Sequence, residues 1–448
     1  MQLSTKKLSP SKPPTNRLAE KLAIAATALV GTTTQGLEKA EEWDFAASIL
    51  AYSELDRVSA AELIFNGEKE YDDSAHLSFK VVIDTLTGAS ANGAIEQNFP
   101  QTFARPSGGL SEDDDIDEGQ FVTPANETPL DDTFKDTRVQ LNISWTDALS
   151  EDYRYTVGTN LSKEYDYASV SVNGEIAKEL NQKNSTLSIG FSGGVDQYNP
   201  EGGIPIAFSS MAIQDQFASS AAFRNAFNAT RGDSSDTITN GEALLGWTQV
   251  VNRKMLIQFN YGFSLSDGYL SDPFKILSVV NANGLTQDLV YENRPDTRTQ
   301  HSIFGLAKYH LDNSVFDVSY RFLTNDWGIT SHTIDSHWHF YGSSGSFWEP
   351  HIRFYQQAAA DFYTPFLVQG VNLPKYASAD YRIGEMTAMT VGLKYGFQLS
   401  DGDRAEIRLE YYKQTPTKAN QPQGVVNLEG LDLYPDIDAF ILQFNYYF

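Results

Sequence analysis

The sequence predicts an all-β protein, a transmembrane antiparallel up-and-down β-barrel of about 16 strands. Three features point to this fold class: segments of alternating polarity recur along the chain, short and long connections alternate between them, and the chain ends on an aromatic strand. Alternation with a period of two indicates strands that have one apolar and one polar face. Because a soluble antiparallel sheet alternates in the same way, the last strand and the connections decide the fold class.

The last strand, DIDAFILQFNYYF, ends the chain on Phe448. Its apolar residues from Phe440 to Phe448 share one parity, whereas Gln443 and Asn445 lie on the opposite face. The strand resembles the closing strand of a bacterial outer-membrane barrel, in which a terminal aromatic residue belongs to the signal read by the barrel-assembly machinery. Phe448 is therefore the expected assembly signal. The edge strand of a soluble sandwich is the alternative.

The other predicted strands have roughly the ten-residue length of a tilted membrane strand. In one of them, Ile257, Phe259 and Tyr261 alternate with Gln258 and Asn260. No apolar run reaches the roughly 18 residues that a transmembrane helix needs. The predicted strands are 44–55, 58–68, 75–86, 136–146, 152–163, 166–179, 184–195, 236–251, 254–266, 298–310, 314–324, 331–342, 346–358, 383–397, 404–415 and 436–448.

Every second connection is short, as at Asp147–Glu151 and Ser400–Asp403, and the intervening set holds all the long ones. Short periplasmic turns and long outer loops on opposite rims are typical of bacterial barrels. An even strand count then places both termini in the periplasm. The long loops are 87–135, 196–235, 267–297, 359–382 and 416–435, and the first two are expected to fold inward.

The amino-terminal residues 1–36 are expected to be a cleaved export signal. Basic residues from Lys6 to Lys21 precede a short apolar segment, Leu22–Val30, that cannot span a bilayer. An ordinary amphipathic first helix is the alternative. Residues 37–448 would then form a single barrel domain in the bacterial outer membrane, surrounded by lipid and lipopolysaccharide.

The amino-acid composition narrows the range of possible functions. Aromatic residues make up 12% of the chain, which suits rings at two membrane interfaces. The net charge of −25 argues against nucleic acid as a partner, because no basic face can be assembled. The chain has no cysteine, which excludes disulfides and thiolate chemistry.

Several segments are similar to a domain-of-unknown-function family of Gram-negative outer-membrane barrels. They are Tyr52-Ser53-Glu54, Asp56-Arg57-Val58, Asp84-Thr85-Leu86-Thr87-Gly88-Ala89-Ser90, Asn92-Gly93-Ala94, Tyr320-Arg321, Asp326-Trp327-Gly328-Ile329-Thr330-Ser331-His332-Thr333, Arg353-Phe354-Tyr355, Ala359-Ala360-Asp361-Phe362-Tyr363 and Asp380-Tyr381-Arg382. The family has no settled activity. Its genes are often described beside thioredoxin-like proteins and enzymes that attach flavin covalently, so the resemblance implies an envelope redox partner or an exported polypeptide.

Inward parity on four strands near the carboxyl end predicts a charged lumen. If the turn after 331–342 centres near Ser344, His337 lies across from His351, His339 from Glu349, and Asp335 from Arg353, with Cβ atoms about 4.5–5.5 Å apart. The predicted pore-lining residues are Asp317, Arg321, Asp335, His337, His339, Glu349, His351, Arg353, Tyr355, Glu406, Arg408 and Glu410.

Two interpretations of this lumen remain open. Imidazoles and a carboxylate at such spacing can hold a transition metal, and His337, His339, His351 and Glu349 are the candidate ligands. A packed, hydrogen-bonded polar lumen needs no metal, and we favour it, so no cofactor is expected.

Two loops carry further candidate features. In Asp326–Thr333, Gly328 is expected to supply a turn conformation, with Trp327 at the membrane interface and His332 beside it. The acidic stretch 111–118, with Asp131 and Asp132, suits hard divalent cations or is a solvated loop.

The sequence therefore favours a channel or translocation pore in which charged rungs set ion preference. The alternative is an export, assembly or electron-transfer sheath around a partner protein. An enzyme is not expected, because a lipase would need a Ser–His pair, and neighbouring Ser331 and His332 point to opposite faces of a strand.

Overall fold

The computed structural model describes residues 43–55, 57–71, 75–88, 91–106, 119–130, 135–399, 402–417, 425, 428, 434 and 436–448. The expected export signal and the acidic stretch 111–118 with Asp131 and Asp132 lie outside these residues, and both stay predictions. None of the described helices has the length and apolar character needed to cross a membrane.

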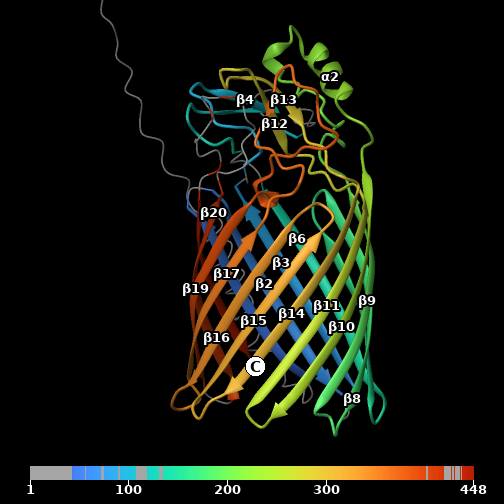
Figure 1. Cartoon of the computed structure of the whole chain (residues 1–448), viewed down its shortest axis with the longest axis vertical. Helices are drawn as coiled ribbons and strands as arrows, with labels where there is room; N and C mark the ends of the chain where they lie inside the picture. Colours follow the sequence, from blue (N-terminus) through green and yellow to red (C-terminus); the bar gives the residue numbers. More distant parts are fainter. Residues whose placement is uncertain are drawn as a thin grey trace, which may run out of the picture. The chain divides into compact units, whose positions relative to one another are not determined.

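Sixteen of the described strands form one closed antiparallel barrel, which confirms the predicted fold class (Figure 1). In barrel order they are β1 (Trp43–Glu54), β2 (Ser59–Glu70), β3 (His76–Thr87), β6 (Lys135–Ser150), β7 (Tyr153–Lys163), β8 (Tyr167–Leu180), β9 (Ser185–Tyr198), β10 (Asp236–Asn252), β11 (Met255–Gly268), β14 (Thr297–His310), β15 (Ser314–Asn325), β16 (Thr330–Tyr341), β17 (Phe347–Gln357), β19 (Met386–Gln398), β20 (Arg404–Pro416) and β21 (Ile437–Tyr447). Each follows the previous one in the chain, so the barrel is an up-and-down meander.

Three predicted boundaries differ from the structure by three residues or more. The strand predicted to end at residue 195 continues to Tyr198 in β9. The predicted turn at Asp147–Glu151 is largely strand, because β6 continues to Ser150 past a register shift in its pairing with β7. The strand predicted to begin at residue 383 begins at Met386, because the residues just before it form the short 3-10 helix η3 (Tyr381–Ile383).

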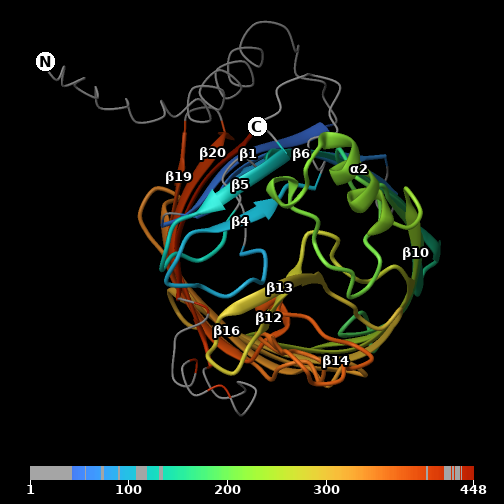
Figure 2. The same cartoon turned by 90° about the horizontal axis from the view of Figure 1, so that it is seen from above.

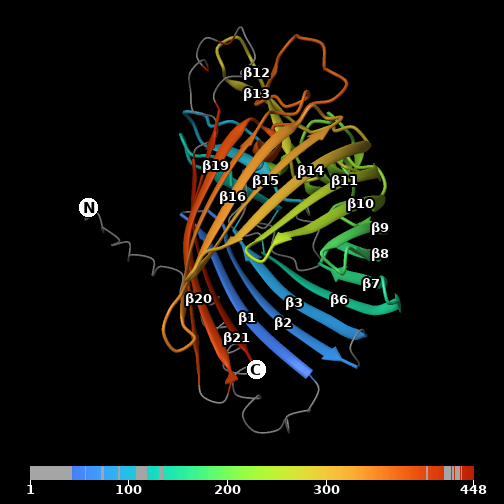
Figure 3. The same cartoon turned by 60° about the horizontal axis from the view of Figure 1, so that its bottom comes forward.

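The last strand closes the barrel by pairing with the first, and Figure 3 shows β21 between β20 and β1. The backbones of Phe45 and Phe448 exchange two hydrogen bonds, each 3.0 Å long. The ring of Phe45 also contacts those of Phe448 and Phe65, with centroids 5.8 and 5.5 Å apart. Phe448 thus completes the closing seam, while its role as an assembly signal stays a prediction.

The outer face of the barrel is apolar and exposed. Val172, Ile352 and Leu409, for example, are 62%, 54% and 57% exposed. Nearly every barrel strand carries such exposed apolar side chains, which together form a belt around the barrel. A continuous apolar surface of this extent is unfavourable in water and is the outer band of a membrane barrel. The fold is that of an outer-membrane-type β-barrel.

The connections divide between two rims as predicted. One rim, called the turn rim, carries short links, including 151–152, 181–184 and 253–254, and the carboxyl end of the chain lies there (Figure 1). The other rim, called the cap rim, carries all the long loops. Which rim faces the periplasm stays a prediction.

The long loops fold together into a cap, defined as residues 91–106, 119–130, 199–235, 269–296 and 358–385. Seen from above, its elements lie over the mouth of the barrel (Figure 2). They are β4 (Gln101–Ala104), β5 (Gln120–Thr123), η2 (Gln214–Gln216), α2 (Ser220–Ala229), β12 (Ile276–Val280), β13 (Thr286–Tyr291), β18 (Leu367–Val368) and η3. The two loops expected to fold inward belong to this cap, and the sequence did not predict that other loops would share their position.

The cap has its own hydrophobic core. Phe103, Phe227, Leu277, Val280 and Phe366 are at most 1% exposed, and all lie in the cap. The barrel wall contributes none of the largest fully buried side chains among the described residues. The cap therefore folds as a packed body rather than as separate loops.

The turn 326–329 joins the barrel to the cap. Gly328 has φ +84°, which confirms its predicted turn role. Trp327 is only 4% exposed, packs with Ile329 and Ile383 and donates from Nε1 to the Thr297 carbonyl at 2.8 Å. Its expected position at the membrane interface is therefore wrong, because the cap covers it.

Replacing Gly328 with Ala is expected to loosen the cap. A Cβ there would meet the Asp361 carboxylate, which must move away from the turn, in addition to the roughly 1–2 kcal/mol cost of a left-handed conformation. Gly370→Ala is the matched control, since Gly370 has φ +81° and its Cβ would meet nothing within 4 Å. Protease cleavage within the cap should accelerate more in Gly328→Ala, and equal rates in the two variants would contradict the steric contact.

Candidate functional site in the barrel lumen

The predicted pore-lining residues lie on four strands of one wall. Their side chains alternate with the exposed apolar residues of the outer face, so they project inward. They are Asp317 and Arg321 on β15; Asp335, His337 and His339 on β16; Glu349, His351, Arg353 and Tyr355 on β17; and Glu406, Arg408 and Glu410 on β20. That they line a conducting pore stays a prediction.

The strand register agrees with the predicted pairs. Asp335 lies opposite Arg353, and His337 lies opposite His351. His339 Nδ1 lies 3.0 Å from Glu349 Oε2. The short turn 342–346 between β16 and β17 sets this register.

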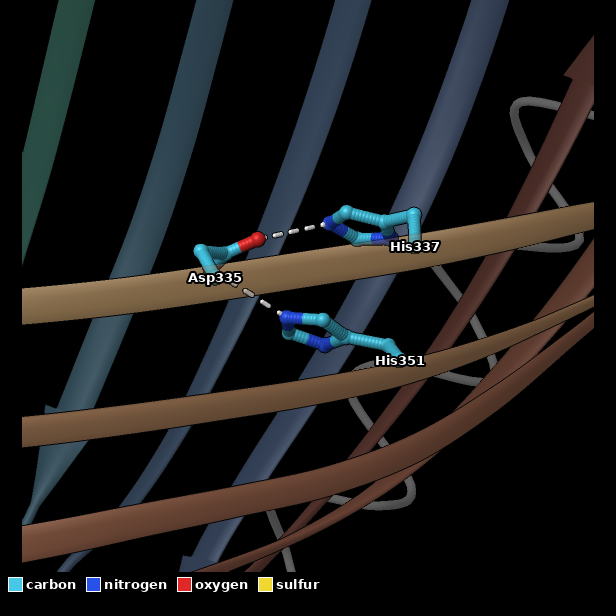
Figure 4. A group of neighbouring side chains, drawn as sticks. All are labelled: Asp335, His337 and His351. Atoms are coloured by element: carbon cyan, nitrogen blue, oxygen red, sulfur yellow. Dashed lines mark hydrogen bonds and ion pairs between the residues drawn. The ribbon is translucent and has the colours of Figure 1, made fainter. Parts of the chain in front are cut away.

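The rings of His337 and His351 stack in parallel, with centroids 4.2 Å apart and planes 2° apart. Both Nε2 atoms face the carboxylate of Asp335, at 3.1 Å for His337 and 3.3 Å for His351 (Figure 4). The three side chains offer ligand atoms that all lie within 4.8 Å of one another.

Each imidazole also has a carboxylate on its other nitrogen. His351 Nδ1 lies 2.8 Å from Glu410 Oε1, and His337 Nδ1 lies 3.5 Å from Glu349 Oε1. Glu349 also pairs with Lys394 Nζ at 2.8 Å. In each ring, the nitrogen that points away from Asp335, Nδ1, thus faces a glutamate that helps to fix the ring.

The structure groups the candidate metal ligands differently from the sequence-based set. That set contained His339 and Glu349 and omitted Asp335 as a ligand. Lys394, His337 and His339 share Glu349, whereas Asp335 faces the Nε2 atoms of both stacked rings. The salt bridge to Lys394 depends on the pairing of β17 with β19, which the sequence analysis did not address.

A cavity of about 570 Å³ lies between this wall and the cap. Arg353, Arg408 and Glu410 line it from the barrel, and Tyr381 and Arg382 line it from the cap. The remaining predicted residues make local contacts: Asp317 with Lys308 at 3.7 Å, Arg321 over the Phe304 ring, Tyr355 with Gln357 and Glu406 with Arg404 at 3.3 Å.

A second cavity, of about 360 Å³, lies against β8 to β14. Gly190, Ser192, Gly262 and Ser264 line it together with the longer side chains of Glu175, Glu242 and Gln300. In the strand order β9 lies opposite β20, and β11 lies opposite β1. Charged side chains therefore line this part of the lumen as well.

A group of charged side chains in the cap centres on the buried carboxylates of Glu292 and Asp380. We call it the charge clamp: Asp272, Glu292, Arg294, Asp380 and Arg382. The Asp380 carboxylate accepts from Arg294 at 2.8 Å and from Arg382 at 2.7–2.9 Å. Arg294 also donates to both oxygens of Glu292, and Arg382 donates to Asp272 at 2.6 Å. The clamp joins loop 269–296 to loop 358–385.

The clamp is electrostatically balanced by Lys275, a buried cation beside it. Burial alone would raise the pKa of the Asp380 carboxyl, but Arg382, with Lys275 and Arg294, holds that pKa well below its usual range. Asp380 is only 1% exposed and is ionised at neutral pH. Asp380-Tyr381-Arg382 is one of the segments that carry the family resemblance, but its sequence did not predict the clamp.

The family model described as "Protein of unknown function (DUF3570)" matches residues 19–448. The match covers nearly the whole chain and confirms the resemblance to a domain-of-unknown-function family. A search of curated proteins finds no significant match.

Three solved structures illustrate what the chain is similar to. The siderophore receptor PirA from Acinetobacter baumannii has 8% identity and a TM-score of 0.40 over 84% of this chain and 53% of that one, so the chain spans about half the receptor's length. OmpTdeltaL8, a loop-deletion mutant of an outer membrane protein of Vibrio cholerae, has 9% identity and a TM-score of 0.38 over 91% and 99% of the two chains. Pseudomonas aeruginosa OccK5 (OpdH) has 10% identity and a TM-score of 0.39 over 91% and 97%.

Replacing Asp380 with Asn should open the cap, because removing one partner of a buried ion pair costs about 3–5 kcal/mol. The pKa of Asp380 is lower in the folded cap than in an unfolded chain. Its contribution is therefore complete above the ordinary Asp pKa of about 4 and is lost as the pH falls below it.

Protease cleavage within the cap measures this effect. At pH 7 it should be fast in Asp380→Asn and slow in the wild type, and acidification below about pH 4 should narrow the difference. Asp288→Asn is the control, because Asp288 lies in the same cap outside the clamp and accepts hydrogen bonds from the Ser210 hydroxyl and the Leu289 backbone N–H. An Asp380 variant as resistant as this control would refute the clamp.

Proposed function

The chain belongs to the DUF3570 family, and we propose that it forms an aqueous channel across the bacterial outer membrane, with the cap over its outer mouth. The proposed function is passage of a solute without catalysis. In this arrangement both termini lie in the periplasm, the apolar belt contacts lipid and lipopolysaccharide, and the barrel-assembly machinery reads Phe448.

The single observation that carries this proposal is the unfilled polar lumen. A barrel of about 16 strands is wide enough for an aqueous channel unless something fills it. The packed hydrophobic side chains gather in the cap, and the lumen holds cavities of about 570, 360 and 540 Å³. Polar side chains line these cavities, which favours water and a hydrophilic solute.

The charged side chains of the lumen support selectivity. Arg353 on β17, with Arg408 and Glu410 on β20, lines the cavity beneath the cap. Charges that line a constriction set ion preference through their field. Arg353 and Arg408 supply positive charge at the cavity beneath the cap, where a solute entering from the cap rim would first meet the wall.

The position of Arg382 supports a gating role for the cap at the entrance to this cavity. Arg382 belongs to the charge clamp and also lines the cavity with Arg408 and Glu410. A conformational change that separates Arg382 from Asp380 therefore changes both the hold on the cap and the entrance to the lumen.

Single-channel recording of the refolded mature protein in planar bilayers tests the channel. Steady conductance steps are expected, more frequent in Asp380→Asn than in the wild type. In a salt gradient, the double variant Arg353→Ser and Arg408→Ser should shift the reversal potential toward cation preference, because two cationic groups leave the cavity wall.

Lys183→Ser is the matched control, since Lys183 lies exposed in the turn 181–184, away from the cavity, and its loss should leave the reversal potential nearly unchanged. Silence from folded wild type and from folded Asp380→Asn would contradict a channel. That result would favour the sheath alternative, in which a redox partner or an exported polypeptide occupies the barrel.

A further inference from the structure

The paired histidines of the lumen wall have a feature that the channel does not require. His337, on β16, and His351, on β17, turn the same ring nitrogen, Nε2, toward one carboxylate, that of Asp335 (Figure 4). The side-chain exposures of Asp335, His337 and His351 are 24%, 33% and 11%, so the group is reachable from the lumen.

The hydrogen bonds leave these nitrogens facing an acceptor. A neutral imidazole has one N–H and one lone pair. If each ring donates its Nδ1 hydrogen to the glutamate beside it, Glu410 for His351 and Glu349 for His337, both Nε2 lone pairs face the oxygens of Asp335. Acceptors at 3.1 and 3.3 Å repel one another unless a cation lies between them.

One metal ion satisfies this arrangement. A single divalent ion would accept both lone pairs and one carboxylate oxygen.

The distances also suit a metal ion. Four ligands at about 2.1 Å in a tetrahedron lie about 3.4 Å from one another, and six in an octahedron about 3.0 Å. His337 Nε2 lies 3.1 Å from Oδ1 of Asp335, and His351 Nε2 lies 3.3 Å from Oδ2, so each nitrogen–oxygen separation lies in this range. One ligand atom from each of the three side chains lies within 4.8 Å of the others, and the side chains must draw closer to bind one ion.

The two glutamates, Glu410 and Glu349, have the positions of residues that orient metal-binding histidines. Histidines that bind a metal commonly donate their other N–H to a carboxylate, which fixes the ring and raises its basicity. Glu410 has this position beside His351, and with a side-chain exposure of 6% it is shielded from solvent.

We propose that Asp335, His337 and His351 bind one divalent transition-metal ion on the lumen wall, with Glu410 and Glu349 as positioning residues. Two imidazoles and one carboxylate suit borderline first-row ions such as Zn²⁺, Ni²⁺, Co²⁺ and Cu²⁺ better than Mg²⁺ or Ca²⁺. The coordination positions that the protein leaves open face the lumen and are available to water or to a passing anionic ligand.

Metal titration of the refolded, untagged mature chain tests the site. Zn²⁺ added in calorimetry should bind with one ion per barrel, and Co²⁺ should give the visible absorption of a low-coordinate N/O site. His337→Gln combined with His351→Gln should abolish this saturable binding. Glu410→Gln, which keeps all three ligands, should weaken it about 10–100-fold.

His332→Gln is the control, because His332 lies on the same strand with its side chain on the outer face, hydrogen-bonded to Tyr320. Circular dichroism and the heat-dependent gel mobility of the folded barrel confirm folding of each variant. The absence of stoichiometric binding to the folded wild type would overturn the proposal, as would equal affinity in the double histidine variant. Because binding is measured without a bilayer, its result is independent of whether the barrel conducts.

Discussion

The requirement that every backbone polar group find a partner inside the protein governs this structure. A lipid-exposed strand edge would leave N–H and C=O groups unpaired at a cost of several kcal/mol each. The seam between β1 and β21 removes that edge, from the pair Ala46–Tyr447 to the pair Glu54–Ala439, and Phe448 extends it by two more hydrogen bonds with Phe45. All other strands can be hairpin-linked neighbours because this one long-range pairing closes the ring.

Closure in lipid also decides where the hydrophobic residues go. The apolar parity of each strand faces outward, so the lumen receives the polar parity and cannot build a hydrophobic core. The chain builds that core in the cap instead, around residues such as Phe103, Val280 and Phe366. Within the cap, the charge clamp around Asp380 joins loop 269–296 to loop 358–385 with ion pairs in place of apolar contacts.

The sequence predicts the features that local patterns encode. Strand positions follow from alternation over about ten residues, and the pairing of His337 with His351 follows from the five-residue turn between their strands. The salt bridge from Lys394 to Glu349 and the contact of Glu410 with His351 were not predicted, since they join strands beyond that hairpin. The clamp was not predicted for the same reason: Arg294 and Asp380 lie 86 residues apart, in loops without a periodic pattern.

One residue of the clamp and one of the paired histidines line the same cavity, which would connect gating with metal binding. Arg382 lines it from the cap, while His351 and Glu410 line it from the wall. Glu410 also lies 3.8 Å from Arg408, so charge on the Arg408 side of the cavity acts on the carboxylate that orients His351. An ion held by His351 would add positive charge at the cavity that Arg382 lines, and a cationic group there is repelled. Occupation of the proposed site would therefore weaken the hold of the clamp through this shared cavity, which Glu410 also lines.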